Sequence, residues 1–382
     1  MDKIFENKEI AELFLPFIEK GFPSRKTFGK KFVNGFKHWH FTEEEIARAN
    51  KNGRLLVLDL EFGTACSLRC QYCYRNMDSR DIGSPLSLDE WKNLVDQAKK
   101  LGVGAVKLIG AGEFFEDPRF FEALNCLLDK KIKVVLFTNG HALADDSLAK
   151  KYQQKTSEEI IDYLFRKDVG VFIKGDSFKP KVMDKIVNYP GYAKLRNTAL
   201  KKLIEKGFAS ESPTRLGLEV QVTKQTYPEL LDIDKLKYYL NIYPDMVTSM
   251  PCGNYFQRQK ENQVIDVSYA KKLELYKKIY EQNRLLDIPF NAVSPFIGGL
   301  NCTQLGYGLY INVRGQVFAC PGKFQNLGNV RDKPLEEIWE NHAEKKKFKE
   351  AYFCPPRTEN QIIQKEMIAK MNSKFGLTTP EN

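Results

Sequence analysis

Strand-like and helix-like runs alternate along the first two thirds of the chain, and this alternation restricts the fold more than any other feature. Six short apolar runs indicate buried strands, at residues 55–61, 105–110, 132–138, 169–174, 216–223 and 242–248. Strands that alternate with helices form parallel sheets built from βα units. A closed barrel of this kind needs eight units, so six predict an α/β fold with a partial (β/α)6 TIM-like barrel.

The remaining sequence divides into an extension before the barrel and a smaller region after it. Thr42 and Glu45 fit a capping box that opens a helix ahead of the barrel. Past residue 288 glycines become frequent, and a hairpin turning at Arg314-Gly315 indicates a small C-terminal hairpin-plus-helix domain. The expected segments are an N-terminal helical extension 1–54, the barrel 55–250, a linker helix 251–290, the C-terminal domain 291–360 and a polar tail 361–382.

Composition excludes several classes of protein. Charged residues make up 28% of the chain and apolar residues 42%, as in ordinary soluble domains. No stretch approaches the roughly 20 apolar residues of a membrane-spanning helix, and the N-terminus has no apolar core of a secretory signal. The net charge of +10 is spread along the chain, which favours a solvated surface over a nucleic-acid site. We therefore expect a cytoplasmic protein with no membrane partner.

Three cysteines lie together directly after the first predicted strand. Cys66, Cys70 and Cys73 occur in the segment GTACSLRCQYCYRN. Thiolates select iron–sulfur clusters, zinc or copper, and a structural zinc site needs four ligands, whereas this segment has three sulfurs and no histidine. Three thiolates can hold three irons of a 4Fe–4S cube and leave the fourth iron open for a substrate. The loop after a βα strand is also where active sites gather.

This cysteine loop, with Tyr72 before its last cysteine, resembles the signature of the radical SAM superfamily. The likeness extends to the end of the second strand, where the chain has Gly110-Ala111-Gly112-Glu113. The superfamily usually has Gly-Gly-Glu there, often followed by proline, so Ala111 and Phe114 are departures. Neither departure removes the backbone N–H or the carboxylate that would meet the methionine amino group.

The resemblance implies an enzyme, a radical SAM oxidoreductase or a related radical-chemistry enzyme. The open iron of its 4Fe–4S cluster would bind S-adenosylmethionine, and one electron would cleave the C–S bond to a 5′-deoxyadenosyl radical that takes a hydrogen atom from the substrate. It further implies an electron donor such as flavodoxin or ferredoxin.

Polar residues at the strand ends are expected to contact this cofactor. Tyr72 would lie near the adenine, and residues ending the third and fourth strands would face the ribose or the carboxylate. Glu219 and Gln221 alternate on the fifth strand and so share one face. Each of these positions is also compatible with an ordinary paired polar residue. The expected cofactor-binding set is Tyr72, Gly112, Glu113, Asn139, Lys174, Asp176 and Glu219.

The late cysteines indicate a second metal centre. Cys302 and Cys320 flank the predicted hairpin, and the block resembles the auxiliary-cluster domains called SPASM and twitch, as does LGNVRDKPLEEIWE from Leu327. Cys354 is followed by Pro-Pro-Arg instead of a C-x-x-C pair, so a full SPASM set is missing. The resemblance implies an auxiliary iron–sulfur cluster on Cys302, Cys320 and Cys354. A zinc-binding or clusterless remnant is the alternative.

Cys252 lies just past the sixth predicted strand, near the expected barrel mouth. It has three interpretations: fourth ligand of the auxiliary cluster, catalytic donor of a hydrogen atom to a substrate radical, or ordinary buried thiol.

The function that these features favour is hydrogen abstraction from a small molecule or a peptide, leading to dehydrogenation, epimerisation or cross-linking. The first 50 residues are too short for the winged-helix module of many peptide-modifying relatives, which favours a small molecule or a leaderless peptide. Two alternatives remain open. One is a nucleic-acid or nucleoside modifying radical SAM enzyme, which the charge alone supports. The other is a non-catalytic iron–sulfur or zinc-binding protein, which would not cleave S-adenosylmethionine.

Overall fold

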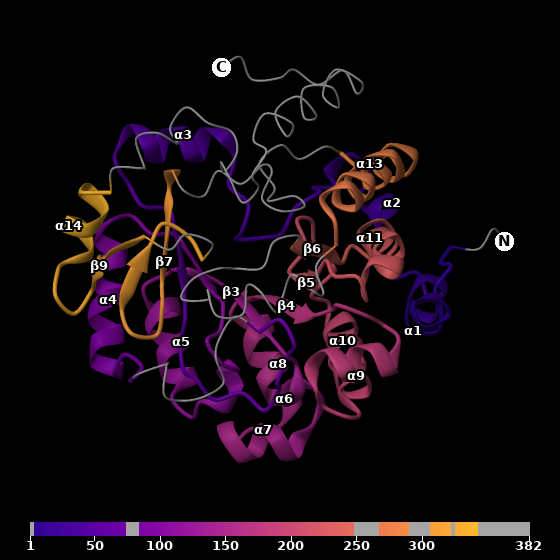
Figure 1. The fold of residues 1–382 in the computed structure, drawn as a ribbon, viewed down its shortest axis with the longest axis horizontal. Coiled ribbons are helices and arrows are strands. Elements are labelled where there is room, and N and C mark those ends of the chain that lie inside the picture. The colour runs from indigo at the N-terminus through magenta and orange to yellow at the C-terminus, as the bar shows by residue number, and fades with distance from the viewer. Residues whose placement is uncertain (1–3, 74–83, 248–266, 290–305, 322–324, 343–382) are drawn as a thin grey trace.

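A computed structural model describes residues 4–73, 84–247, 267–289, 306–321 and 325–342. Within these residues, nine strands form one sheet in the order β6-β5-β4-β3-β2-β1-β7-β8-β9 (Figure 1). The strands are β1 Val57–Leu60, β2 Ala105–Leu108, β3 Lys133–Thr138, β4 Gly170–Lys174, β5 Leu216–Gln221, β6 Tyr243–Val247, β7 Gly308–Ile311, β8 Gln316–Phe318 and β9 Asn326–Asn329.

The first six strands are those that the sequence predicts. Each pairs with the next in parallel, beginning with Val57 opposite Ala105 and ending with Gln221 opposite Val247. Parallel pairing places all six carboxyl ends at one edge of the sheet, which is the active-site edge of βα barrels. The open parallel sheet confirms the predicted partial barrel.

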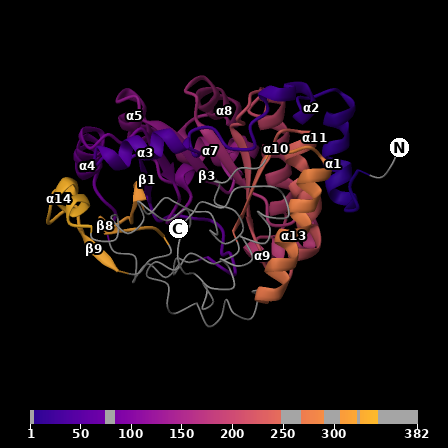
Figure 2. The same ribbon diagram turned by 90° about the horizontal axis from the view of Figure 1, so that it is seen from above.

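Helices cover the outer side of this curved sheet (Figure 2). Their sequences account for their boundaries: α4 begins with a capping box between Ser87 and Glu90 and buries Trp91 and Leu94. The helices are α1 Lys8–Glu19, α2 Arg25–Phe28, α3 Glu43–Lys51, α4 Leu88–Lys100, α5 Phe120–Asp129, α6 His141–Ala144, α7 Asp146–Gln153, α8 Ser157–Arg166, α9 Pro180–Val187, α10 Tyr192–Lys206, α11 Leu230–Tyr239, α13 Tyr269–Leu285 and α14 Leu335–Glu340. Three short 3-10 turns are η1 Gly29–Lys31, η3 Phe114–Glu116 and η4 Tyr227–Glu229.

Between β3 and β4, residues 146–166 form two helices, α7 and α8. Gln154 takes a left-handed conformation with φ 55°, which ends α7. Thr156 and Glu159 then form a capping box that starts α8. The chain breaks at Pro190-Gly191 between α9 and α10. The capping box at Thr42 is as predicted.

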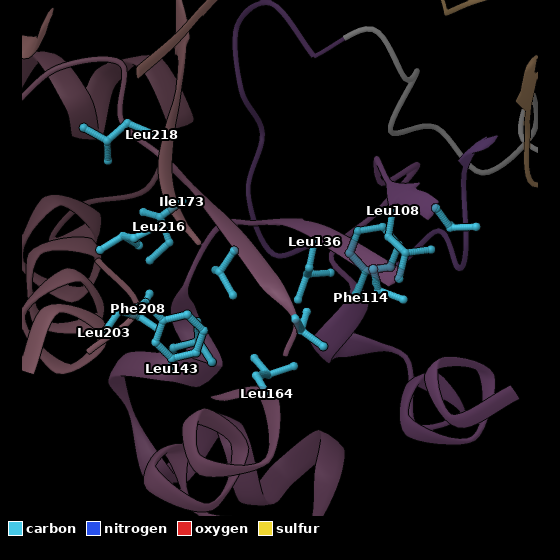
Figure 3. Close-up of a cluster of buried hydrophobic side chains, with 14 of the residues drawn as sticks. Leu108, Phe114, Leu136, Leu143, Leu164, Ile173, Leu203, Phe208, Leu216 and Leu218 are labelled. Atoms are coloured by element: carbon cyan, nitrogen blue, oxygen red, sulfur yellow. The ribbon is translucent and has the colours of Figure 1, made fainter. Parts of the chain in front are cut away.

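The core lies between the outer face of the sheet and these helices. Leucine, isoleucine and valine side chains from alternate strand positions meet leucines and phenylalanines of the helices (Figure 3). Leu108, Leu136 and Leu218 are each almost completely buried there. Because side chains alternate along a strand, the residues before and after each of these leucines face the barrel interior.

The C-terminal hairpin continues the barrel sheet. β7 pairs in parallel with β1, and Gly308 lies opposite Val57. The hairpin turns at Gly315, as predicted, with φ 79°. Glu61, just past β1, accepts hydrogen bonds from the Tyr310 hydroxyl at 2.6 Å and from the Val313 amide at 3.1 Å. The boundaries proposed for separate segments remain predictions.

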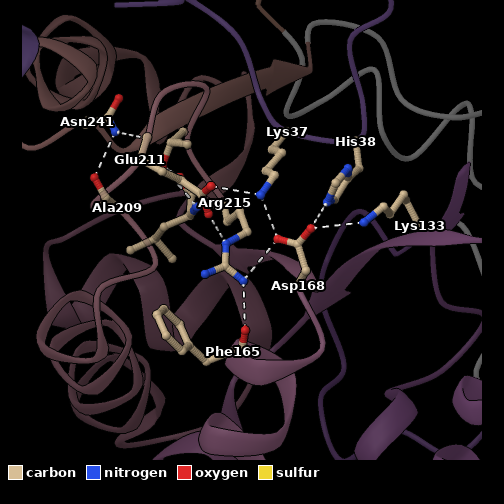
Figure 4. Close-up of polar contacts among 11 residues, drawn as sticks. Lys37, His38, Lys133, Phe165, Asp168, Ala209, Glu211, Arg215 and Asn241 are labelled. Atoms are coloured by element: carbon tan, nitrogen blue, oxygen red, sulfur yellow. Dashed lines mark hydrogen bonds and ion pairs between the residues drawn. The ribbon is translucent and has the colours of Figure 1, made fainter. Parts of the chain in front are cut away.

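The N-terminal extension closes the amino end of the barrel. Phe36 bridges to Thr214 beside β5, and its ring contacts Phe172 and Tyr243 on the inner face. Lys37 and His38 reach Asp168, which lies just before β4 and also binds Lys133 and Arg215 (Figure 4). No helix in the described part of the chain is long and apolar enough to cross a membrane.

Candidate functional site

The cysteine loop lies at the carboxyl end of β1. Cys66, Cys70 and Cys73 are all partly buried and none of them forms a disulfide. The middle of the loop is fastened to the end of α9, where the Arg69 amide donates to the Val187 carbonyl at 3.0 Å and the Gln71 amide donates to Ile186 at 2.8 Å. Leu68 and Tyr72 pack in an apolar cluster with α9 and α10, so the loop has a fixed position on the barrel.

The turn after β2 packs directly on the start of this loop. A Cβ atom at Gly112 would lie 2.3 Å from the Ala65 carbonyl oxygen, so only glycine fits. The Glu113 amide donates to that same carbonyl at 2.7 Å. Ala111, by contrast, buries its methyl group beside Val313. The departure from Gly-Gly-Glu therefore falls at the position of the turn that has room for a side chain.

The Glu113 carboxylate is held by the end of β3. Thr138 Oγ1 and the Asn139 amide each donate to it at 2.6 Å. Burial, together with the charge of Glu116, raises the pKa of Glu113 to about 7, although these two hydrogen bonds act to lower it. The predicted pair Gly112 and Glu113 thus joins the cysteine loop to the third strand.

A second contact to the cysteine loop was missed by sequence reasoning. Glu116 Oε1 accepts from both the Ser67 amide at 3.1 Å and the Ser67 hydroxyl at 2.7 Å. His141 Nδ1 lies 3.0 Å from that hydroxyl. Since the serine proton goes to Glu116, Nδ1 is the donor and Nε2 carries the lone pair. Burial lowers the pKa of His141 to about 4, so the ring is neutral.

The predicted residues on β4 and β5 form one charged network with Tyr72. The Tyr72 hydroxyl donates to Asp176, and Lys174 Nζ lies 3.3 Å from Asp176 and 3.6 Å from Glu219. The same ammonium stands 4.5 Å from the centre of the Tyr72 ring. Burial opposes the charge on Lys174, but Asp176, Tyr72 and Glu219 raise its pKa well above its usual value.

Several buried polar atoms around this network have no hydrogen-bond partner among the described residues. They are Asn139 Nδ2, His141 Nε2 and Gln221 Oε1. A buried polar atom without a partner is costly, so such atoms commonly mark a binding site. All three belong to segments that follow or end strands at the same edge as the cysteine loop.

The donor set of the cysteine loop fits a cluster held by three thiolates. Burial, together with the nearby carboxylate of Glu113, raises the pKa of Cys66, and burial raises that of Cys70 to about 12. These thiols must lose protons when they bind metal. No three cysteine, histidine or carboxylate side chains in the described part of the chain meet closely enough to hold a single metal ion. The loop therefore offers three separate thiols.

Other charged residues face the barrel interior, and sequence reasoning missed them. Lys107 Nζ on β2 lies 3.7 Å from Asp59 Oδ1 on β1 and 4.6 Å from the centre of the Trp39 ring. Asp245 on β6 pairs in register with Glu219. The available signal was a charged residue between apolar neighbours in each predicted strand, which is the same signal that identified Glu219.

The late cysteines are described only in part. Cys320 is buried just after β8 and forms no disulfide. Cys252, Cys302 and Cys354 lie outside the described residues. The auxiliary ligand set and the role of Cys252 remain predictions.

Comparison with known proteins identifies two regions. The model of the radical SAM superfamily matches residues 60–231, and that of the SPASM iron–sulfur cluster-binding domain matches residues 302–362. The tungsten-containing aldehyde ferredoxin oxidoreductase cofactor-modifying protein of Pyrococcus furiosus is 25% identical over 74% of this chain and 80% of its own length. The AdoMet-dependent heme synthase of Methanosarcina barkeri is 21% identical over 75% of this chain and 82% of its own length.

Among solved structures, Streptococcus suis SuiB bound to its precursor peptide SuiA has a TM-score of 0.54. It is 16% identical and the match covers 92% of this chain and 81% of SuiB, so this likeness concerns the fold.

Proposed function

Because the chain belongs to the radical SAM superfamily and carries a SPASM domain, we propose that it abstracts a hydrogen atom from a small-molecule or peptide substrate. The observation that supports this most is the convergence of the cysteine loop, the Gly112-Glu113 turn and the Lys174 network on one edge of the sheet. When bound, a 4Fe–4S cluster supplies the electron that cleaves S-adenosylmethionine, and the SPASM domain implies an auxiliary iron–sulfur cluster as well.

We assign separate roles to the residues at this edge. Cys66, Cys70 and Cys73 hold the first cluster, and Glu113 receives the amino group of S-adenosylmethionine. Lys174 and Asp176 provide opposite charges within 3.3 Å for the carboxylate and the ribose hydroxyls. Asn139 Nδ2 is a free donor beside Glu113, since the Asn139 amide already donates to that carboxylate. Together these groups orient the cofactor and exclude water from its reactive carbon.

The relatives support both substrate classes. One acts on a cofactor and one is named a heme synthase, while SuiB binds a precursor peptide. The substrate decides whether hydrogen abstraction leads to a dehydrogenated, epimerised or cross-linked product. Electron delivery by flavodoxin or ferredoxin is part of the same proposal.

The test is an iron, sulfide and product analysis under anaerobic conditions. Wild type and a Cys66→Ala, Cys70→Ala, Cys73→Ala variant are reconstituted, and 5′-deoxyadenosine is measured after S-adenosylmethionine and dithionite are added. We expect about eight irons in wild type and about four in the variant, because each cluster holds four. Deoxyadenosine is expected from wild type alone. Its absence from iron-loaded wild type would contradict the proposal and favour a non-catalytic binding protein.

A further inference from the structure

Asp245 differs from the other charged residues of the barrel interior in what surrounds it. The residue is 8% exposed, and its carboxylate makes no hydrogen bond or ion pair to the described residues. Its neighbours Tyr243 and Glu219 show that it faces inward: Tyr243 packs on Phe36 and Phe172 of the inner face, and Glu219 lies opposite Asp245 in the sheet. A carboxylate is thus buried toward the lumen without a partner.

Two lysines that face the barrel interior lie close to carboxylates other than Asp245. Lys174 lies between Asp176 and Glu219, and Lys107 lies 3.7 Å from Asp59. Asp59, Asp176 and Glu219 each lie near one of these two lysines. Lys107 attracts Asp245 without forming an ion pair, while Glu219 repels it. Asp245 therefore has no ion-pair partner among the described residues of this wall.

A second buried acceptor, on the neighbouring strand β5, also lacks a donor among the described residues. Gln221 is 3% exposed, and its Nε2 donates to Glu219 Oε1 at 2.8 Å. Its Oε1 has no partner among the described residues. Gln221 lies two residues beyond Glu219 on the same inward face, so acceptors without donors flank Glu219 on two strands.

We propose that Asp245, with Gln221 Oε1 on the neighbouring strand, binds a positively charged hydrogen-bond donor of the substrate, an ammonium or guanidinium group. This inference rests on the proposed function, since it concerns the substrate of the same barrel. Burying an unpaired carboxylate is costly, and a ligand cation removes that cost while gaining a charge-assisted hydrogen bond. Burial and the charge of Glu219 raise the pKa of Asp245 to about 7, as expected for a carboxylate that lacks its cation.

Binding of matched probes to the reconstituted holoenzyme with S-adenosylmethionine tests this. One pair is 1,5-diaminopentane and 1,5-pentanediol, and the other is the end-blocked peptide Gly-Gly-Lys-Gly-Gly and its norleucine analogue. We expect the cation of at least one pair to bind at least about tenfold more tightly than its neutral partner. The pair that shows the preference tells whether a free amine or a peptide side chain is recognised. Equal binding, or no binding of any probe, overturns the proposal.

The variant Asp245→Asn should abolish the preference, and Asp96→Asn should retain it. Asp96 lies on α4 and pairs with Lys130 at the surface, with half of its side chain exposed, so it controls for loss of charge alone. Retention of the preference in Asp245→Asn would contradict the proposal. So would a weakened affinity for S-adenosylmethionine without any cation preference, which would assign Asp245 to the cofactor.

Thermal unfolding separates a binding role from a structural role. Without probe, Asp245→Asn holoenzyme should unfold about 2 °C higher or more, because it removes a buried, unpaired charge. A structural aspartate would show the opposite shift, and a lower Tm or loss of folding would overturn the proposal. Deoxyadenosine formation by wild type is measured alongside: its absence rejects the proposed function, whereas its presence without a cation preference rejects this inference alone.

Discussion

The two ends of the barrel contain similar residue types but differ in how completely their polar groups are paired. At the amino end, Asp168 is bound by Lys37, His38, Lys133 and Arg215. At the carboxyl end, Asn139 Nδ2, His141 Nε2 and Gln221 Oε1 are buried without partners among the described residues. The amino end is built for stability, whereas the carboxyl end retains free donors and acceptors that a ligand can satisfy.

The largest expected effect comes from Gly112→Ala at the carboxyl end. The new methyl group would lie 2.3 Å from the Ala65 carbonyl and force the turn away from the cysteine loop. We expect a loss of about 4 kcal/mol or more in the free energy of unfolding, and about half the iron of wild type on reconstitution. The matched control Ala111→Gly should cost about 1 kcal/mol and keep its iron. Full iron in Gly112→Ala would show that the turn does not position the loop.

Lys174→Met should destabilise the carboxyl end next most strongly. It leaves Asp176 and Glu219 close together without their shared cation. Removal of one partner from a buried charge network costs about 3–5 kcal/mol, and affinity for S-adenosylmethionine should fall with it, measured by equilibrium dialysis. Lys206→Met, which breaks the more exposed pair with Asp162, is the control and should change stability by less than about 1 kcal/mol. If both variants lowered the stability equally, the buried Lys174 network would contribute no more than a surface ion pair.

Asp168→Asn probes the amino end. Burial opposes the charge of Asp168, yet hydrogen bonds from Lys37 and Lys133 and the charge of His38 lower its pKa to about 2. A carboxylate with a lowered pKa stabilises the fold above pH 4, and this stability is lost as the pH falls through 2. We expect the variant to lose about 2 kcal/mol at pH 7 and to unfold in acid with a weaker pH dependence than wild type.

The same Asp168→Asn variant should leave the affinity for S-adenosylmethionine unchanged, because Asp168 precedes β4 and its network therefore lies at the amino end of the barrel. A large fall in that affinity would mean that the two ends are coupled.

The smallest effect is expected from Ser67→Ala. The substitution removes the hydroxyl that links Glu116 to His141 but keeps the Ser67 amide bond to Glu116. A lost hydrogen bond of this kind costs about 1 kcal/mol. The more informative readout is the electron paramagnetic resonance spectrum of the reduced cluster with S-adenosylmethionine, which should change in this variant. It should stay the same in Ser147→Ala, an exposed helix-start serine on α7. An unchanged spectrum in both would show that the link is merely structural.

The sequence predicted the six barrel strands because strand alternation is a local signal. Motif spacing led to the candidate site residues, whose roles remain predictions. Lys174, Asp176 and Glu219 were expected at one edge and do form one network. The Ser67–Glu116–His141 contact was not predicted, because Glu116 and His141 lie 49 and 74 positions from Ser67 and carry no motif of their own. Asp245 carried the right local signal, but its missing partner is visible only when the neighbouring strands are assembled.

The pairing of β7 with β1 has a consequence for how the chain matures. Gly308 can join Val57 only after some 250 residues have been made between them. At typical ribosomal speeds this takes roughly 10 to 50 s, during which the edge of β1 lacks its final neighbour. The cysteine loop leaves that same strand, so a nascent chain exposes its thiols on an unfinished sheet for that interval. Oxidation of these thiols before the sheet is complete is the corresponding risk.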